Sequence, residues 1–63
     1  MSVALADARD LNEVLQHLNA LGNEITNGID GGYVDACYVA EKADFAASAL
    51  DRIKQRHENR RSN

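Results

Sequence analysis

Disulfides and proline are both missing from this 63-residue chain, which contains one cysteine, no proline and no tryptophan. The single Cys37 excludes an intramolecular disulfide, and a lone thiol is typical of a protein kept in a reducing compartment. Because proline is absent, no fixed break interrupts a helical pattern. A chain this short without disulfides needs a metal, self-association or very regular helix packing to fold stably.

Metal ligands and long apolar runs are scarce as well. His17, Cys37 and His57 are spaced twenty residues apart, so no two of them share one turn as zinc ligands often do. We therefore expect no metal and no cofactor. The sequence also has no run of about 18 apolar residues and no charged segment leading into an apolar one, which predicts a soluble, cytoplasmic protein without a membrane span or signal peptide.

Apolar residues in the first half of the chain recur at spacings of three and four, the pattern of one face of an amphipathic helix. We predict this helix over residues 7–27, with Asp7 as its N-cap and the Asn27-Gly28 pair as its end. Its apolar stripe consists of Leu11, Val14, Leu18, Leu21 and Ile25.

The second half repeats this pattern and predicts a helix over about residues 35–60, followed by a basic, frayed end. Its stripe consists of Val39, Ala43, Ala46, Leu50, Ile53 and His57. Asp35 is one candidate N-cap for this helix. Asp44 is the alternative, because the segment YVDACYV is rich in strand-forming residues and would then stay extended.

The two predicted helices are joined by a glycine-rich turn at about residues 28–34. Since each helix has one apolar stripe to bury and the connection is short, the helices must pack antiparallel. The predicted fold is all-α, a single helical-hairpin domain over residues 1–63. Small residues such as Ala43 and Ala46 on the second helix would allow the two backbones to approach closely.

The turn itself has two interpretations. Gly28, Gly31 and Gly32 could form a nest of backbone amides that binds phosphate, but the lysine and hydroxyl of a phosphate loop are absent and Asp30 would repel an anion. We therefore favour a simple chain reversal. Catalysis is not expected either, because Cys37 has no histidine base near it in sequence.

Some apolar residues fall outside the predicted contact between the helices. Tyr38 and Phe45 lie on one flank of the second helix, and Leu15 lies on a flank of the first. These flanks predict a homodimer that forms a four-helix bundle. The alternative is that Tyr38 and Phe45 cover the turn as a lid. The residues expected in the core or dimer contact are Leu11, Val14, Leu15, Leu18, Leu21, Ile25, Val39, Leu50 and Ile53.

The net charge of −3 conceals an uneven distribution: residues 1–51 carry two basic and nine acidic side chains, and residues 52–63 carry five basic and one acidic. A basic end can bind nucleic acid, and the residues for such a site are Lys42, Arg52, Lys54, Arg56, Arg60 and Arg61. However, an antiparallel hairpin would place this end beside Asp7, Asp10 and Glu13, which would neutralise it. We therefore rank nucleic-acid binding below protein binding.

The segments SVALADARDLNEVLQHLNALGNEI and NGIDGGYVDACYV, followed by a basic end, resemble a short early-region protein of bacteriophage lambda and its relatives, encoded between the exonuclease and excisionase genes. The resemblance covers the full length but includes no catalytic motif. It implies a non-enzymatic accessory protein in the host cytoplasm that acts on host physiology or on the choice between lysis and lysogeny. Our hypothesis is a regulator that binds a host or phage protein through Tyr38, Phe45, Arg52 and Arg56.

Overall fold

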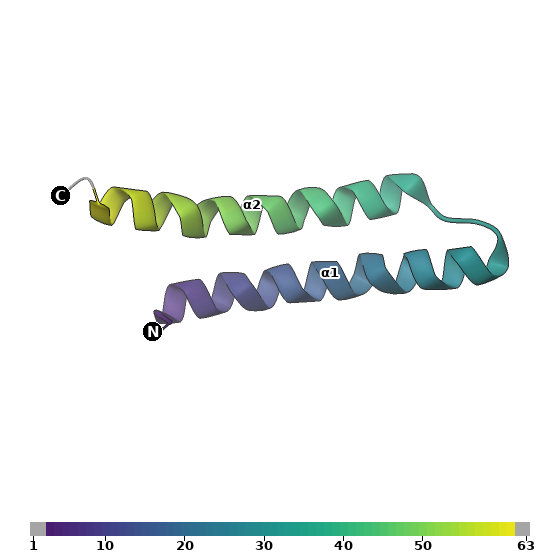
Figure 1. Cartoon of the computed structure of the whole chain (residues 1–63), viewed down its shortest axis with the longest axis horizontal. Coiled ribbons are helices and arrows are strands. Elements are labelled where there is room, and N and C mark those ends of the chain that lie inside the picture. The colour runs from purple at the N-terminus through teal and green to yellow at the C-terminus, as the bar shows by residue number, and fades with distance from the viewer. Residues whose placement is uncertain (1–2, 62–63) are drawn as a thin grey trace.

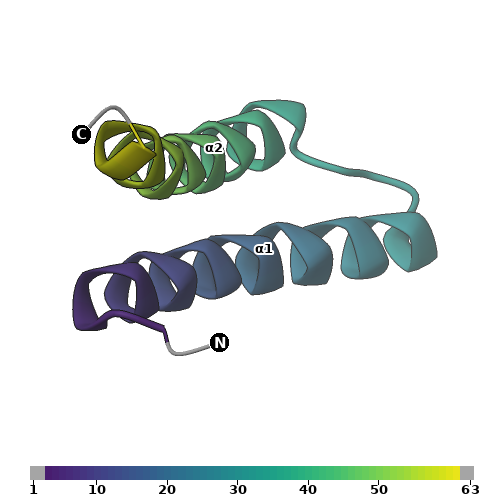
Figure 2. The ribbon, with the colours of Figure 1, turned by 60° about the vertical axis from the view of Figure 1, so that its left-hand side comes forward.

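The computed structural model describes residues 3–61, which form two α-helices. Helix α1 spans Leu5–Gly31 and helix α2 spans Ala36–Arg61. The helices lie side by side and antiparallel, so that the start of α1 and the end of α2 meet at one end of the molecule (Figures 1 and 2). We call this the open end and the opposite one the turn end. The predicted all-α hairpin is confirmed, and its backbone measures 51 × 19 × 13 Å.

Helix α1 is longer at both ends than its sequence pattern predicts. It begins after Ala4, which makes no side-chain capping bond, so the prediction of Asp7 as the N-cap is wrong. At the other end, Gly32 adopts the left-handed conformation with φ of 79°. The amides of Gly32 and Tyr33 both donate to the carbonyl of Gly28, which closes the helix one turn later than the Asn27-Gly28 pair suggests.

Gly28 has a different role from the predicted helix stop. It is buried inside α1, where the chain leaving the helix folds back over it. A methyl group at this position would overlap the carbonyl oxygen of Tyr33 and the side chain of Val34. Gly28 is therefore required for the close approach of the turn to the helix.

Helix α2 begins at Ala36, as the first of the two sequence alternatives predicts. The amide of Tyr38 donates to Asp35 Oδ1 at 3.1 Å, so Asp35 is the N-cap and the segment after it is not extended. The amide of Asp35 in turn donates to Glu24 Oε2 at 3.2 Å. This second bond fixes the start of α2 against the last third of α1.

The contact between the helices is narrower and more polar than predicted. Among residues 3–60, only Val14, Ala46 and Ala49 are buried apolar residues. The line of α1 that faces α2, here called the inner line, consists of Asp7, Asp10, Val14, His17, Leu21, Glu24 and Gly28, all buried or half-buried. The matching line of α2 consists of Val39, Lys42, Ala46, Ala49, Ile53 and Arg56.

Part of the predicted core is therefore wrong for the hairpin by itself. Leu11, Leu18, Ala43 and Leu50 are exposed, although the sequence pattern places them between the helices. Val14 is buried as predicted, and Leu21, Ile25, Val39 and Ile53 are half-buried. The physical reason is that Ala46 and Ala49, rather than the bulkier residues beside them, allow the closest approach of the two backbones.

Candidate interaction surfaces

The hairpin has two broad faces, and contacts between the helices assign residues to each. On one face, Arg52 reaches Asp10 and Phe45 lies against His17. On the other, Leu11, Ile53 and His57 line a common cavity. We call the first the aromatic face and define it by His17, Tyr38, Lys42, Phe45 and Arg52. The second is the leucine face, defined by Leu11, Leu15, Leu18, Ala43 and Leu50.

Cation and ring contacts organise the aromatic face. Lys42 Nζ lies 5.3 Å from the ring centroid of Tyr38 and 5.8 Å from that of Phe45. The Phe45 ring also lies 5.2 Å from the His17 ring, tilted by 31°. Because Phe45 contacts the middle of α1, it does not cover the turn as a lid. The two rings are held in place while remaining exposed.

An ion-pair cluster joins the helices at the open end. Arg56 Nη2 lies 2.7 Å from Asp7 Oδ1 and 2.6 Å from Asp10 Oδ2. His57 Nε2 lies 2.9 Å from Asp7 Oδ2, so both oxygens of Asp7 are engaged. The cluster is completed by Arg52, which contacts Asp10 at 3.1 Å and also pairs with Glu13. The structure thus places these three carboxylates beside the basic end, as predicted, and pairs them with Arg52 and Arg56.

This cluster shifts the ionisation of its two inner carboxylates. The side chains of Asp7 and Asp10 are only 8% and 14% exposed. Hydrogen bonds from Arg56, and then from His57, lower the pKa of Asp7 below its usual value. Hydrogen bonds from Arg56 and Arg52 lower the pKa of Asp10 in the same way. The carboxylates are therefore stabilised in their charged form by contacts that exist only in the folded hairpin.

The four predicted partner-binding residues do not form one site. Tyr38 and Phe45 are exposed together on the aromatic face. Arg52 lies at the edge of that face but is paired with Asp10 and Glu13. Arg56 is half-buried between the helices, where it contacts the carboxylates of α1. Sequence spacing along α2 could not reveal this, because the carboxylates come from the other helix.

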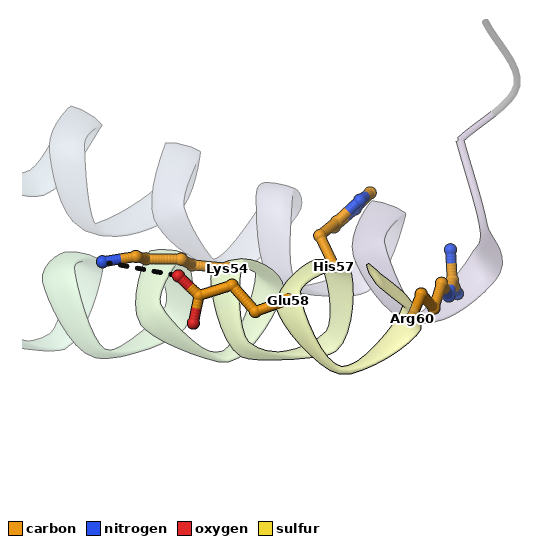
Figure 3. A pocket seen from close by; sticks show the side chains of 4 residues that line it. All are labelled: Lys54, His57, Glu58 and Arg60. Atoms are coloured by element: carbon orange, nitrogen blue, oxygen red, sulfur yellow. Dashed lines mark ion pairs between the residues drawn. The ribbon is translucent and has the colours of Figure 1, made fainter. Parts of the chain in front are cut away.

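The remaining basic residues near the open end surround a shallow cavity lined by Lys54, His57, Glu58 and Arg60 (Figure 3). Lys54 Nζ lies 3.9 Å from Glu58 Oε1 along the outside of α2. The His57 side chain points across toward α1. Together with the paired Arg52 and Arg56, these contacts partly neutralise the set predicted for nucleic acid, and the side chain of Arg61 lies outside the described part of the structure.

The leucine face carries the main exposed apolar surface. The exposed fractions of Leu11, Leu15, Leu18 and Leu50 are 43%, 55%, 47% and 48%. On α1 these leucines belong to a second line with alternating spacings of three and four, here called the outer line. It consists of Ala8, Leu11, Leu15, Leu18, Gly22, Ile25 and Ile29. The stripe predicted from sequence periodicity shares Leu11, Leu18 and Ile25 with this line but places them in the contact with α2.

No family model, curated protein or solved structure matches the chain. Among residues 3–61, no group of three or more histidine, cysteine, aspartate or glutamate side chains is placed to hold a metal ion. Neither described helix has an apolar stretch that could cross a membrane. The chemistry of the two broad faces is therefore the basis for an interpretation of function.

Proposed function

We propose that this chain is a non-enzymatic interaction protein that forms a homodimer through its leucine face and binds a second protein through its aromatic face. The observation that carries the proposal is the displacement between the apolar stripe of α1 and its line of contact with α2. Leu11 and Leu18 follow the inner-line residues Asp7 and Val14 by four positions, which rotates them by about 40° around the helix.

The same displacement occurs on α2, in the direction of the same face. Ala43 and Leu50 are exposed, and they follow Val39 and Ala46, which face α1, by four positions. In a four-helix bundle each helix contacts two neighbours, so its apolar arc points between them rather than straight at either one. Both helices of this hairpin have an arc of that kind, which supports pairing of two hairpins.

The size of the contact also supports a dimer. In the described part of the hairpin, the buried apolar residues are one valine and two alanines, which give a small hydrophobic contribution. A broad face of 51 × 19 Å has a footprint close to the roughly 800 Å² per partner that stable interfaces bury. Pairing through the leucine face would remove Leu11, Leu15, Leu18 and Leu50 from water in one step.

Dimerisation of this kind leaves the aromatic face available. Tyr38 and Phe45 are large exposed rings, and aromatic residues are frequent energetic centres of protein interfaces. Arg52 borders them at the open end of that face. From the sequence resemblance to phage early proteins, we propose a host or phage protein as the partner, and an effect on host physiology or on the choice between lysis and lysogeny as the outcome.

The test compares the double variant Leu15→Glu/Leu18→Glu with Tyr38→Ala/Phe45→Ala, using sedimentation velocity and thermal melts over a range of concentrations up to about 100 μM. Charges buried in the leucine face should weaken self-association at least a hundredfold, because unpaired charges in an apolar contact are costly. The aromatic-face variant should remain a dimer and lose its partner in a pull-down. A wild-type protein that stays monomeric, with a melting temperature independent of concentration, would contradict the proposal.

A further inference from the structure

The charges of the hairpin are separated along its length as well as between its faces. The turn half, residues 22–44, carries five acidic and one basic side chain, a formal charge of −4. The open end, residues 3–13 with 52–61, carries four acidic and six basic side chains, a formal charge of +2. The hairpin, which is 51 Å long, is therefore an electric dipole that is negative toward the turn and positive toward the open end.

The ion-pair cluster keeps the charges at the two ends of the hairpin separate. Asp7, Asp10 and Glu13 form ion pairs with arginine and histidine side chains of the open end, and not with residues of the turn end. At the turn end, Asp30, Glu41 and Asp44 are exposed and have no ion-pair partner among the described residues. The acidic end of the molecule thus presents unneutralised carboxylates to any neighbour.

From this placement we infer that the two copies of the proposed homodimer pack antiparallel, with the turn end of each beside the open end of the other. The inference depends on the homodimer proposed above and specifies its geometry. A parallel dimer would bring two ends of charge −4 together, whereas an antiparallel dimer places each of them against an end of charge +2. Like charges held close together repel, and this repulsion selects between the two orientations.

The leucine face is compatible with antiparallel packing of the two copies. Leu15, Leu18 and Leu50 lie near the middle of the hairpin, because α1 is centred at about residue 18 and α2 at about residue 48. A twofold axis perpendicular to the long axis therefore brings one leucine cluster onto the other. It also places the two aromatic faces on opposite outer surfaces of the bundle, so that a dimer presents two identical partner sites.

The single cysteine provides a direct test. Cys37 is exposed at the turn end, and a spin label on it reports only distances between copies, since each chain carries one label. With a rise of about 1.5 Å per residue, Cys37 lies about 17 Å along the axis from the centre of the leucine cluster. Double electron–electron resonance should therefore give a distance of about 35 Å or more in an antiparallel dimer.

A parallel dimer would instead place the two Cys37 labels at the same end, separated by about 15–20 Å across the bundle. The control moves the label to the middle of α2 with Cys37→Ser/Ser48→Cys, where the two labels lie at nearly the same height along the axis in both orientations. A short Ser48→Cys distance with a long Cys37 distance supports the inference. Short distances from both positions overturn the orientation but keep the dimer, and no dipolar coupling from either position overturns the proposed dimer itself.

Discussion

Helix α1 carries two lines of residues with the same spacing and opposite chemistry. The inner line, which faces α2, contains three carboxylates and a histidine. The outer line, one residue further around the helix, contains no charged residue, and its three leucines are all exposed. In a hairpin that functioned alone, these two chemistries would be expected in the reverse order.

The two lines contribute differently: the inner line determines how the helices are aligned, and the outer line provides apolar area for association. The inner line specifies register, because Asp7 and Asp10 meet Arg56 only when the two helices are aligned as observed. A slip of one turn would break the present contacts of Asp7, which is largely buried, with Arg56 and His57. The outer line has no such restriction and offers mainly apolar area, which is the larger source of association free energy. Specific pairing and apolar burial are thus divided between two sides of one helix.

The largest difference in stability between the two lines should appear when the glycine on each line is replaced with alanine. On the inner line, Gly28→Ala forces a methyl group into the Tyr33 carbonyl and the Val34 side chain, and we expect a loss of about 3 kcal/mol. On the outer line, Gly22 has open space around it, so Gly22→Ala should stabilise the helix by about 0.5–1 kcal/mol. Urea unfolding followed by circular dichroism measures both, and equal effects would refute the assignment of the two lines.

A smaller effect is expected from the alanine pair that sets the distance between the helices. Ala49 is fully buried, and Ala49→Leu should destabilise the hairpin by about 1–2 kcal/mol because the larger side chain pushes the backbones apart. The control is Ser48→Leu, one residue away and exposed, which should change the free energy of unfolding by less than about 0.5 kcal/mol. If both variants unfold at the same denaturant concentration as wild type, Ala49 is not the point of closest contact.

The smallest expected effect is the response of the ion-pair cluster to acid. Contacts in the folded state lower the pKa of Asp7 and of Asp10, so these residues stabilise the fold above their ordinary pKa near 4. This stabilisation is lost as the pH falls through the lowered pKa values of the folded state. Unfolding curves between about pH 6 and pH 2 should show the decline. The variant Asp7→Asn/Asp10→Asn should be less stable at neutral pH and show a flatter acid limb, and a limb as steep as that of wild type would contradict this role.

Periodicity and capping chemistry were sufficient to predict the helices and the antiparallel hairpin. The Asp35 cap is confirmed by its bond to the Tyr38 amide, and the neutralisation of the basic end follows from the antiparallel order alone. The sequence does not predict the end of α1 correctly, because Gly28 and Gly32 look alike in sequence. Only the fold distinguishes a glycine required for close approach from one required for positive φ.

The rotation of each helix about its own axis could not be read from the apolar stripes. A stripe indicates where apolar residues lie but does not say how many neighbours will cover them. In the hairpin, Ala49 takes the central position that periodicity assigned to Leu50, since a small residue permits closer packing. One signal was present: Asp7, Asp10, His17 and Glu24 share the spacing of a helix face, with basic residues at complementary positions on α2.

The division of the hairpin into a glycine-closed turn and an ion-paired open end also implies an order of folding. The bond from the Asp35 amide to Glu24 joins residues 11 apart in sequence, whereas Asp7 and Arg56 are 49 apart. Closing the shorter loop costs less chain entropy, so contacts nearest the turn should form first and the helices should join progressively toward the open end. Opening should follow the reverse path, with amide hydrogens exchanging fastest beside the ion-pair cluster and slowest beside Gly28.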